Sequence, residues 1–110
     1  MIRHIIIWKL KETDTPEEKE RIKDGIRSAL EGLNGKIPGM VSLRVRTEKL
    51  PSSTGDVILD SLFKDGNALA GYSIHPLHVA AADGFVRPYT AVRTSFDYAV
   101  KEEELPDEHV

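Results

Sequence analysis

The sequence predicts one α+β domain with the ferredoxin-like order β-α-β-β-α-β, in which a four-stranded sheet carries its helices on one face. Three observations lead to this prediction. Four segments are rich in β-branched and apolar residues, an amphipathic helix with a clear start separates the first two, and a helical region broken by proline separates the last two. The pattern contains no internal repeat.

The predicted strands cover residues 2–10, 40–48, 57–63 and 91–100. In the first strand, alternation places His4, Ile6 and Trp8 on one face, and Ile5 and Ile7 on the other. Both faces are therefore largely apolar, so we expect both to be covered.

The first helix is predicted to begin after Thr15. Thr15 is a capping residue, Pro16 suits the first helical position, and Glu18 completes a capping box. Apolar residues then recur at helical spacing from Ile22 to Leu33, and glycines at 32 and 35 end the pattern.

The second helical region starts after Asp65 and is interrupted at His75. Pro76 disfavours helix at the residue before it but can begin a new helix, so we expect a second piece from Pro76 to about Val86. His75 stands at the position that would cap this second piece.

The face of the sheet away from the helices still holds apolar side chains, namely Ile5, Ile7, Ile58, Leu62, Val92 and Phe96. An apolar patch of this kind usually marks an interface, and two sheets packed face to face would bury it. We therefore expect a homodimer.

Composition narrows the function classes. With 110 residues, of which 40% are hydrophobic and 30% charged, the chain has the balance of one folded domain. A net charge of -3 without a Lys/Arg run argues against nucleic acid, and the longest apolar run is too short for a membrane span. The absence of cysteine excludes disulfides and thiolate chemistry. We expect a cytoplasmic protein with its domain over residues 1–100 and a frayed acidic tail over 101–110.

Several segments resemble those of a known family, the stress-responsive dimeric α/β-barrel (Dabb) domain, over about residues 1–100. They are the opening strand over 1–11, the turn Ile37-Pro38-Gly39-Met40, Tyr72 with His75-Pro76-Leu77-His78-Val79, Phe85-Val86-Arg87-Pro88, and Phe96-Asp97-Tyr98. The resemblance implies a homodimer whose two sheets form a barrel. It does not imply one function, because the family includes members without assigned activity, stress-linked plant proteins, and plant polyketide cyclases that need no cofactor.

The cyclase branch implies candidate catalytic residues. Those enzymes use a Tyr and the second His of a His-Pro-x-His segment, positions that Tyr72 and His78 occupy here, and His4 matches a first-strand His that faces the same cleft. His78 would take a proton from a carbon acid or hydroxyl, and Tyr72 would donate a hydrogen bond to a developing enolate oxygen. The stretch over residues 79–84, which has alanines in place of bulkier pocket residues, departs from the cyclase pattern, as do Arg93 and Ser95. The substrate should therefore differ.

The cleft around these residues is expected to be largely apolar with a few polar groups, as in most small-molecule sites. Its expected ligand-binding residues are Ile6, Trp8, Ile22, Ile26, Leu59, Ser61 and Arg93. Arg93 would favour an acidic ligand. We expect no cofactor, and no metal, since Pro76 intervenes between His75 and His78 and no carboxylate has clear ligand spacing.

Whether the protein is an enzyme stays open at this level, and three hypotheses remain. The first is a small-molecule-binding dimer, a cofactor-free enzyme of the polyketide-cyclase or proton-transfer type. The second is a non-catalytic stress-response or assembly protein, in which His78 only bonds to backbone or Tyr72. The third is a cofactor-independent monooxygenase on the same general fold. An open cleft with His78 and Tyr72 pointing into it favours the first.

Overall fold

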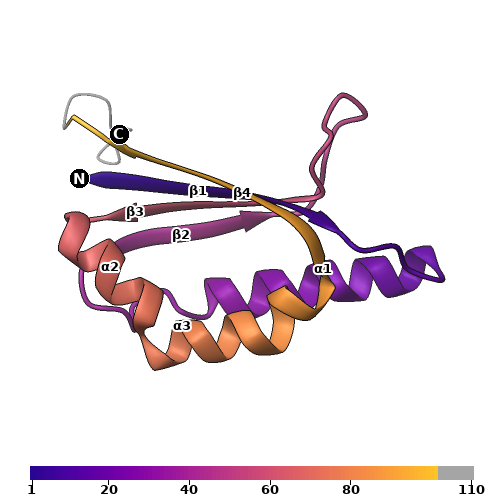
Figure 1. The fold of residues 1–110 in the computed structure, drawn as a ribbon, viewed down its shortest axis with the longest axis horizontal. Helices are drawn as coiled ribbons and strands as arrows, with labels where there is room; N and C mark the ends of the chain where they lie inside the picture. Colours follow the sequence, from indigo (N-terminus) through magenta and orange to yellow (C-terminus); the bar gives the residue numbers. More distant parts are fainter. Residues whose placement is uncertain (102–110) are drawn as a thin grey trace, which may run out of the picture.

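The computed structural model describes residues 1–101 and has the predicted ferredoxin-like α+β architecture (Figure 1). Its strands form one antiparallel sheet in the order β2-β3-β1-β4, and the helices lie along one face. The elements in chain order are β1 (Ile2–Leu10), α1 (Pro16–Glu31), β2 (Met40–Arg46), β3 (Val57–Phe63), α2 (Gly66–Ile74), α3 (Pro76–Ala81) and β4 (Thr90–Ala99). Apart from Lys101, the expected acidic tail lies outside the described residues. None of the described helices is long and apolar enough to cross a membrane.

Helix α1 begins where the sequence predicts. The Thr15 hydroxyl accepts a hydrogen bond from the Glu18 backbone N–H at 3.1 Å, and Pro16 occupies the first helical position. The backbone N–H of Gly32 donates to the Ser28 carbonyl at the other end. The chain then reverses at Gly35, whose φ of +80° is a conformation that glycine adopts without strain.

The pairing of β1 with both neighbours decides which side chains face the helices. His4 lies opposite Ser61 on one side and Asp97 on the other, and residues directly opposite in an antiparallel pair share a face. The core fills this helix-facing side. Its centre contains Ile26 and Phe63, neither of which has any exposed surface.

The second helical region is less regular than the sequence predicts. Pro76 does break it and start α3, but α3 ends at Ala81 instead of continuing to Val86. A π-helical turn over Ala82–Val86 and a 3-10 turn over Arg87–Tyr89 follow. Gly84 weakens a regular helix there and Pro88 cannot extend one. These turns lead the chain back to β4 at the edge of the sheet (Figure 1).

Asp56 fastens the end of the β2–β3 loop to β1 and α1. Its carboxylate accepts hydrogen bonds from the Leu10 N–H at 2.8 Å and from Lys49 Nζ at 2.9 Å, and Lys19 Nζ of α1 lies 3.5 Å away. Burial alone would raise the pKa of Asp56. The two hydrogen bonds and the two ammonium charges outweigh burial and lower the pKa from 3.8 to about 2.

We expect acidification to remove the stabilisation that Asp56 provides. The folded pKa lies below the unfolded value, so the contribution is complete above pH 3.8 and is lost as the pH falls toward 2. A shift of this size corresponds to about 2 kcal/mol in the free energy of unfolding. Urea unfolding of wild type and Asp56→Asn should differ by about this amount near neutral pH and by clearly less at about pH 3. An equal difference at both pH values would contradict the assignment.

The sheet face away from the helices is apolar and open. Ile7 is 41% exposed, Val92 51% and Phe96 67%, whereas Leu62, also predicted on this face, is already buried within the chain. The β2–β3 loop rises on the same side of the sheet (Figure 1). Between this loop and the strands, with Ile7 and Ile58 in its wall, lies a hollow of about 460 Å³.

Candidate functional site

The break between α2 and α3 positions two histidines differently. His75 caps α3, because its Nδ1 accepts a hydrogen bond from the Leu77 N–H at 3.1 Å. His78 lies within α3, half-buried, with its Nδ1 3.2 Å from the Ser73 carbonyl oxygen of α2. A carbonyl oxygen only accepts, so Nδ1 of His78 carries the proton and donates. The lone pair of the neutral ring is therefore on Nε2.

The surroundings of His78 favour this neutral form. Burial lowers the pKa of His78 below its usual 6.5, and the charges of Arg87, His4 and Arg93 lower it further, against the opposing effect of the bond to Ser73. At neutral pH the ring is thus neutral, with its proton on Nδ1. Its Nε2 carries no proton and makes no hydrogen bond among the described residues. That is the state a general base requires.

Tyr72 of α2 joins His78 to the core. Its ring lies 4.1 Å from the His78 ring and 5.0 Å from the Phe63 ring, measured between centroids. The Tyr72 hydroxyl has no hydrogen-bond partner within residues 1–101, and no fully enclosed side-chain polar atom there lacks one, so the hydroxyl oxygen reaches accessible surface. Burial raises the pKa of Tyr72 to about 12, although the charge of Arg93 opposes the shift. The hydroxyl therefore keeps its proton and can donate.

His4 completes the group from the sheet. Its ring centroid is 6.3 Å from that of Tyr72, and its Nδ1 is hydrogen-bonded to the Asp97 carboxylate of β4. The Ser61 hydroxyl donates to the His4 backbone carbonyl at 2.8 Å and holds β1 in place at this point. A carboxylate on one ring nitrogen orients the ring and leaves the other nitrogen, Nε2, for a ligand.

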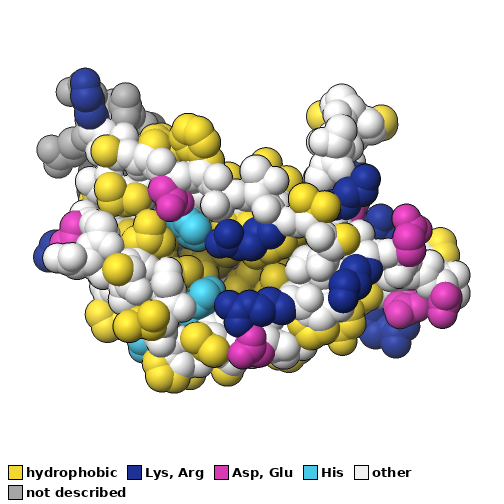
Figure 2. Space-filling model, in the orientation of Figure 1, with side chains coloured by type: hydrophobic (Ala, Val, Ile, Leu, Met, Phe, Trp, Pro, Cys, Tyr) yellow, Lys and Arg dark blue, Asp and Glu magenta, His cyan; other side chains and the backbone are white. Residues whose placement is uncertain are grey.

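The face of the molecule shown in Figure 2 has a hollow. Its floor is hydrophobic, and its rim carries His together with Lys or Arg side chains. The strand register places Arg93 and Ser95 opposite Trp8 and Ile6, on the helix-facing side of β4, and the charge of Arg93 acts on both Tyr72 and His78. Both are exposed although they face the helices, because the helices leave this edge strand uncovered.

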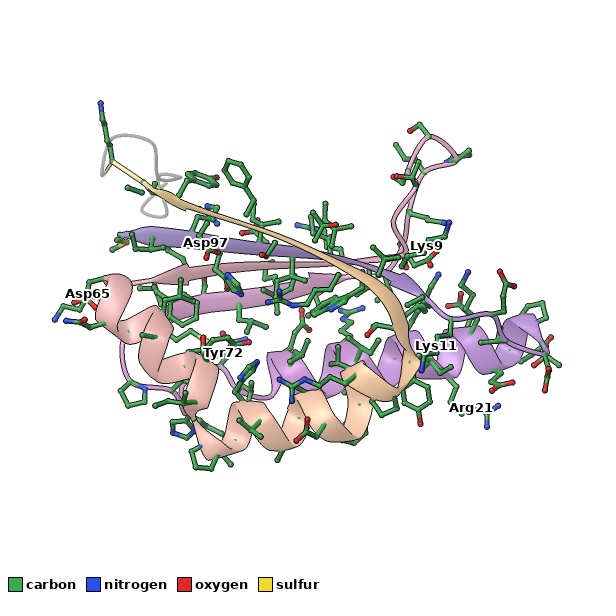
Figure 3. All side chains as sticks on the ribbon, in the orientation of Figure 1. Lys9, Lys11, Arg21, Asp65, Tyr72 and Asp97 are labelled. Atoms are coloured by element: carbon green, nitrogen blue, oxygen red, sulfur yellow. The ribbon has the colours of Figure 1, made fainter. Side chains whose placement is uncertain are left out.

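Figure 3 labels Tyr72 in the helix layer and Asp97 in the sheet. Tyr72 points from α2 toward the sheet, while Asp97 lies on the strand above it. Within residues 1–101 no three His, Asp or Glu side chains are grouped closely enough to hold a metal ion. The side chains themselves provide an imidazole base in His78, a phenol donor in Tyr72 and, in His4, an imidazole bonded to a carboxylate.

The family model for the stress responsive A/B barrel domain (Dabb) matches residues 2–100. This chain belongs to the Dabb family. Among curated proteins no match is found for it. Several solved structures are similar to this Dabb domain over nearly their whole length.

Three of those structures illustrate the range. A dimeric ferredoxin-like protein of unknown function from Bacteroides fragilis has 28% identity and a TM-score of 0.82, covering 90% of this chain and 95% of that one. A dimeric ferredoxin-like protein of unknown function from Thermobifida fusca has 23% identity and a TM-score of 0.72, covering 90% of each chain. A hydroxynitrile lyase from Passiflora edulis has 17% identity and a TM-score of 0.67, covering 92% of this chain and 94% of that one. The last two show likeness of fold.

The structure separates the predicted lining residues of this Dabb domain into four groups. Ile6, Trp8, Ile26 and Leu59 are enclosed in the core, so any contact with a ligand is confined to the floor of the hollow. Ser61 is enclosed and engaged with the His4 carbonyl. Ile22 lies in a different groove, between α1 and the segment containing Phe85 and Tyr89. Arg93 is exposed on the helix-facing side of β4, and its charge acts on both Tyr72 and His78.

The sequence alone does not reveal Asp97 as the partner of His4. In the sequence, the Asp-Tyr pair of the last strand only supports the resemblance to the family. What connects Asp97 to His4 is the β1–β4 register, which shifts by a residue at Lys9/Leu10. Such a register cannot be counted along the chain, because it depends on which strands pair.

Proposed function

We propose that this Dabb domain binds a small carbonyl compound and transfers a proton next to the carbonyl without a cofactor, as an enzyme of the polyketide-cyclase or a related proton-transfer type. One observation carries the proposal. His78 is a neutral imidazole with a free Nε2, its ring lies 4.1 Å from that of Tyr72 between centroids, and the Tyr72 hydroxyl remains a donor. A base and a hydrogen-bond donor side by side at an apolar hollow are the groups that enolate chemistry needs.

The proposed step moves one proton. Nε2 of His78 takes a proton from the carbon next to the carbonyl, and the electrons of that C–H bond form the enolate while its oxygen accepts a hydrogen bond from Tyr72. The enolate carbon then either regains the proton from His78 or attacks a second carbonyl to close a ring. In the second case the C=O π electrons of that carbonyl move to its oxygen, and the resulting alkoxide takes the proton from His78. A positioned base contributes about 10²–10⁴-fold to such a rate. His4, oriented by Asp97, is available to bond the second oxygen through Nε2.

Deuterium exchange tests this directly. The probe is the methyl ester of β-benzoylpropionate, a ketone with exchangeable hydrogens beside its carbonyl, followed by proton NMR in D2O. Wild type should accelerate exchange, and His78→Asn should lose about 100-fold, because asparagine can still donate to the Ser73 carbonyl but has no base. Tyr72→Phe should lose less, since one hydrogen bond is removed. Because the pKa of His78 is lowered, the rate should persist below pH 6.5 before it falls.

His75→Asn is the matched control. It changes a histidine three residues away in the same segment, and asparagine is also a good N-cap, so α3 should be retained. Exchange at the wild-type rate in a folded His78→Asn variant would overturn the proposal. It would instead favour the non-catalytic alternative, in which the histidine only ties α3 to α2.

We also propose that the protein is a homodimer through the apolar sheet face. That face presents Ile7, Val92 and Phe96 with large exposed fractions, and the β2–β3 loop rises at one end of it (Figure 1). The related proteins from Bacteroides fragilis and Thermobifida fusca are described as dimeric. A second copy of the chain offers the same apolar face, and two such faces packed together would bury both.

A further inference from the structure

We propose that Arg93 is an anchor for an acidic group, so that the ligand of the hollow is a carbonyl compound that also carries a carboxylate. The inference rests on the proposed function for the place of the reacting carbonyl, beside His78 and Tyr72. It adds the class of ligand and the residue that selects it.

Arg93 has no counter-ion in the described part of the chain. Arg3, Arg27 and Arg87 each form an ion pair, with Asp60, Glu31 and Asp83 respectively, whereas Arg93 forms none within residues 1–101. Arg21, Arg44 and Arg46 form none either, but of these four arginines it is Arg93 whose charge acts on Tyr72 and His78. The acid nearest along the same strand face, Asp97, is bonded to His4. An unpaired guanidinium at the wall of a hollow is thus free to bind an anion.

The position of Arg93 points to the ligand and not to the sheet interface. It lies opposite Trp8, on the helix-facing side of β4, where the floor of the hollow is apolar (Figure 2). A guanidinium binds a carboxylate through two parallel hydrogen bonds, and such bonds are stronger beside apolar surface than in open water. Arg87, whose charge also acts on His78, is paired with Asp83 and is the weaker candidate.

The distance along β4 between Arg93 and Asp97, the partner of His4, is long enough for a ligand to lie between Arg93 and the His4 ring. Arg93 and Asp97 are four residues apart in a strand, which separates their Cα atoms by about 13 Å. An acid group held by the long Arg93 side chain would leave the ligand's carbonyl directed toward Tyr72 and His4. A compound whose carbonyl and carboxylate are a few carbons apart fits this arrangement.

Calorimetric titration with a matched pair of probes tests the inference. β-Benzoylpropionate carries the carboxylate, and its methyl ester has the same ketone without the charge. Wild type should bind the acid at least about tenfold more tightly than the ester, and Arg93→Gln should remove that preference without weakening the ester. Arg21→Gln is the control, since Arg21 is an exposed arginine of α1 that lies apart from Tyr72 in Figure 3 and the variant has the same net charge.

The outcomes separate this inference from the proposed function. Equal loss of acid binding in Arg93→Gln and Arg21→Gln, or no preference for the acid in wild type, would overturn Arg93 as the anchor, even if the ester still undergoes exchange. Acid binding that depends on Arg93 would support the anchor, even if the ester shows no catalysed exchange and the proton-transfer proposal fails.

Discussion

Replacing Ile7 with glutamate is expected to leave the protein monomeric. Ile7 lies between Ile58 and Thr94 at the middle of the exposed sheet face, so the new carboxylate would be buried without a partner in the proposed dimer. An unpaired buried charge costs about 3–5 kcal/mol, and a two-fold interface contains the substitution twice. The dimer dissociation constant should therefore rise by about four orders of magnitude or more. Sedimentation at micromolar concentration measures the change.

Two further variants make this test decisive. Ile7 also contacts Gly55 of the β2–β3 loop, so its substitution can disturb the chain itself. Phe96→Glu avoids that, because Phe96 is 67% exposed in the single chain. Leu77→Glu is the control. Leu77 is 45% exposed, close to the 41% of Ile7, but it lies on α3 away from the sheet face. A monomeric wild type, or a dimeric Phe96→Glu, would show that this face is not the interface.

Replacing Phe63 with alanine is expected to lower the free energy of unfolding by several kcal/mol. Phe63 has no exposed surface and lies against the rings of both His4 and Tyr72. Removing it loses the transfer free energy of the ring and leaves a cavity, which together cost about 3–5 kcal/mol in the free energy of unfolding. Urea unfolding at one fixed protein concentration measures this, so that any association contributes equally.

The same substitution should also loosen the site, because the ring that supports Tyr72 from behind is lost. Phe63→Leu, which retains much of the volume, should cost about 1.5 kcal/mol or less. Phe85→Ala serves as the surface comparison, since Phe85 is 49% exposed and should lose about 1 kcal/mol or less. A Phe63→Ala variant as stable as Phe85→Ala would mean that the core does not depend on this ring.

Much of the site could be expected from the sequence only as a set of residue types. The placement of His75 as a cap followed from its position before Pro76, and the structure confirms that cap. The bond between His78 and the Ser73 carbonyl, which fixes the proton on Nδ1, depends on how far the chain turns between α2 and α3. A proline shows that a helix breaks there but not the angle at which it resumes.

The sequence by itself determined the strands, the start of α1, the break at Pro76 and the apolar outer face of the sheet. Each depends on local rules, namely residue period, capping and the missing N–H of proline, which act over a few neighbours. Only the tertiary structure decided that Asp97 meets His4 from 93 positions away, and that the charge of Arg93 acts on Tyr72 and His78 while Ile22 lies in another groove. Those contacts follow from strand register and helix packing, which no single segment specifies.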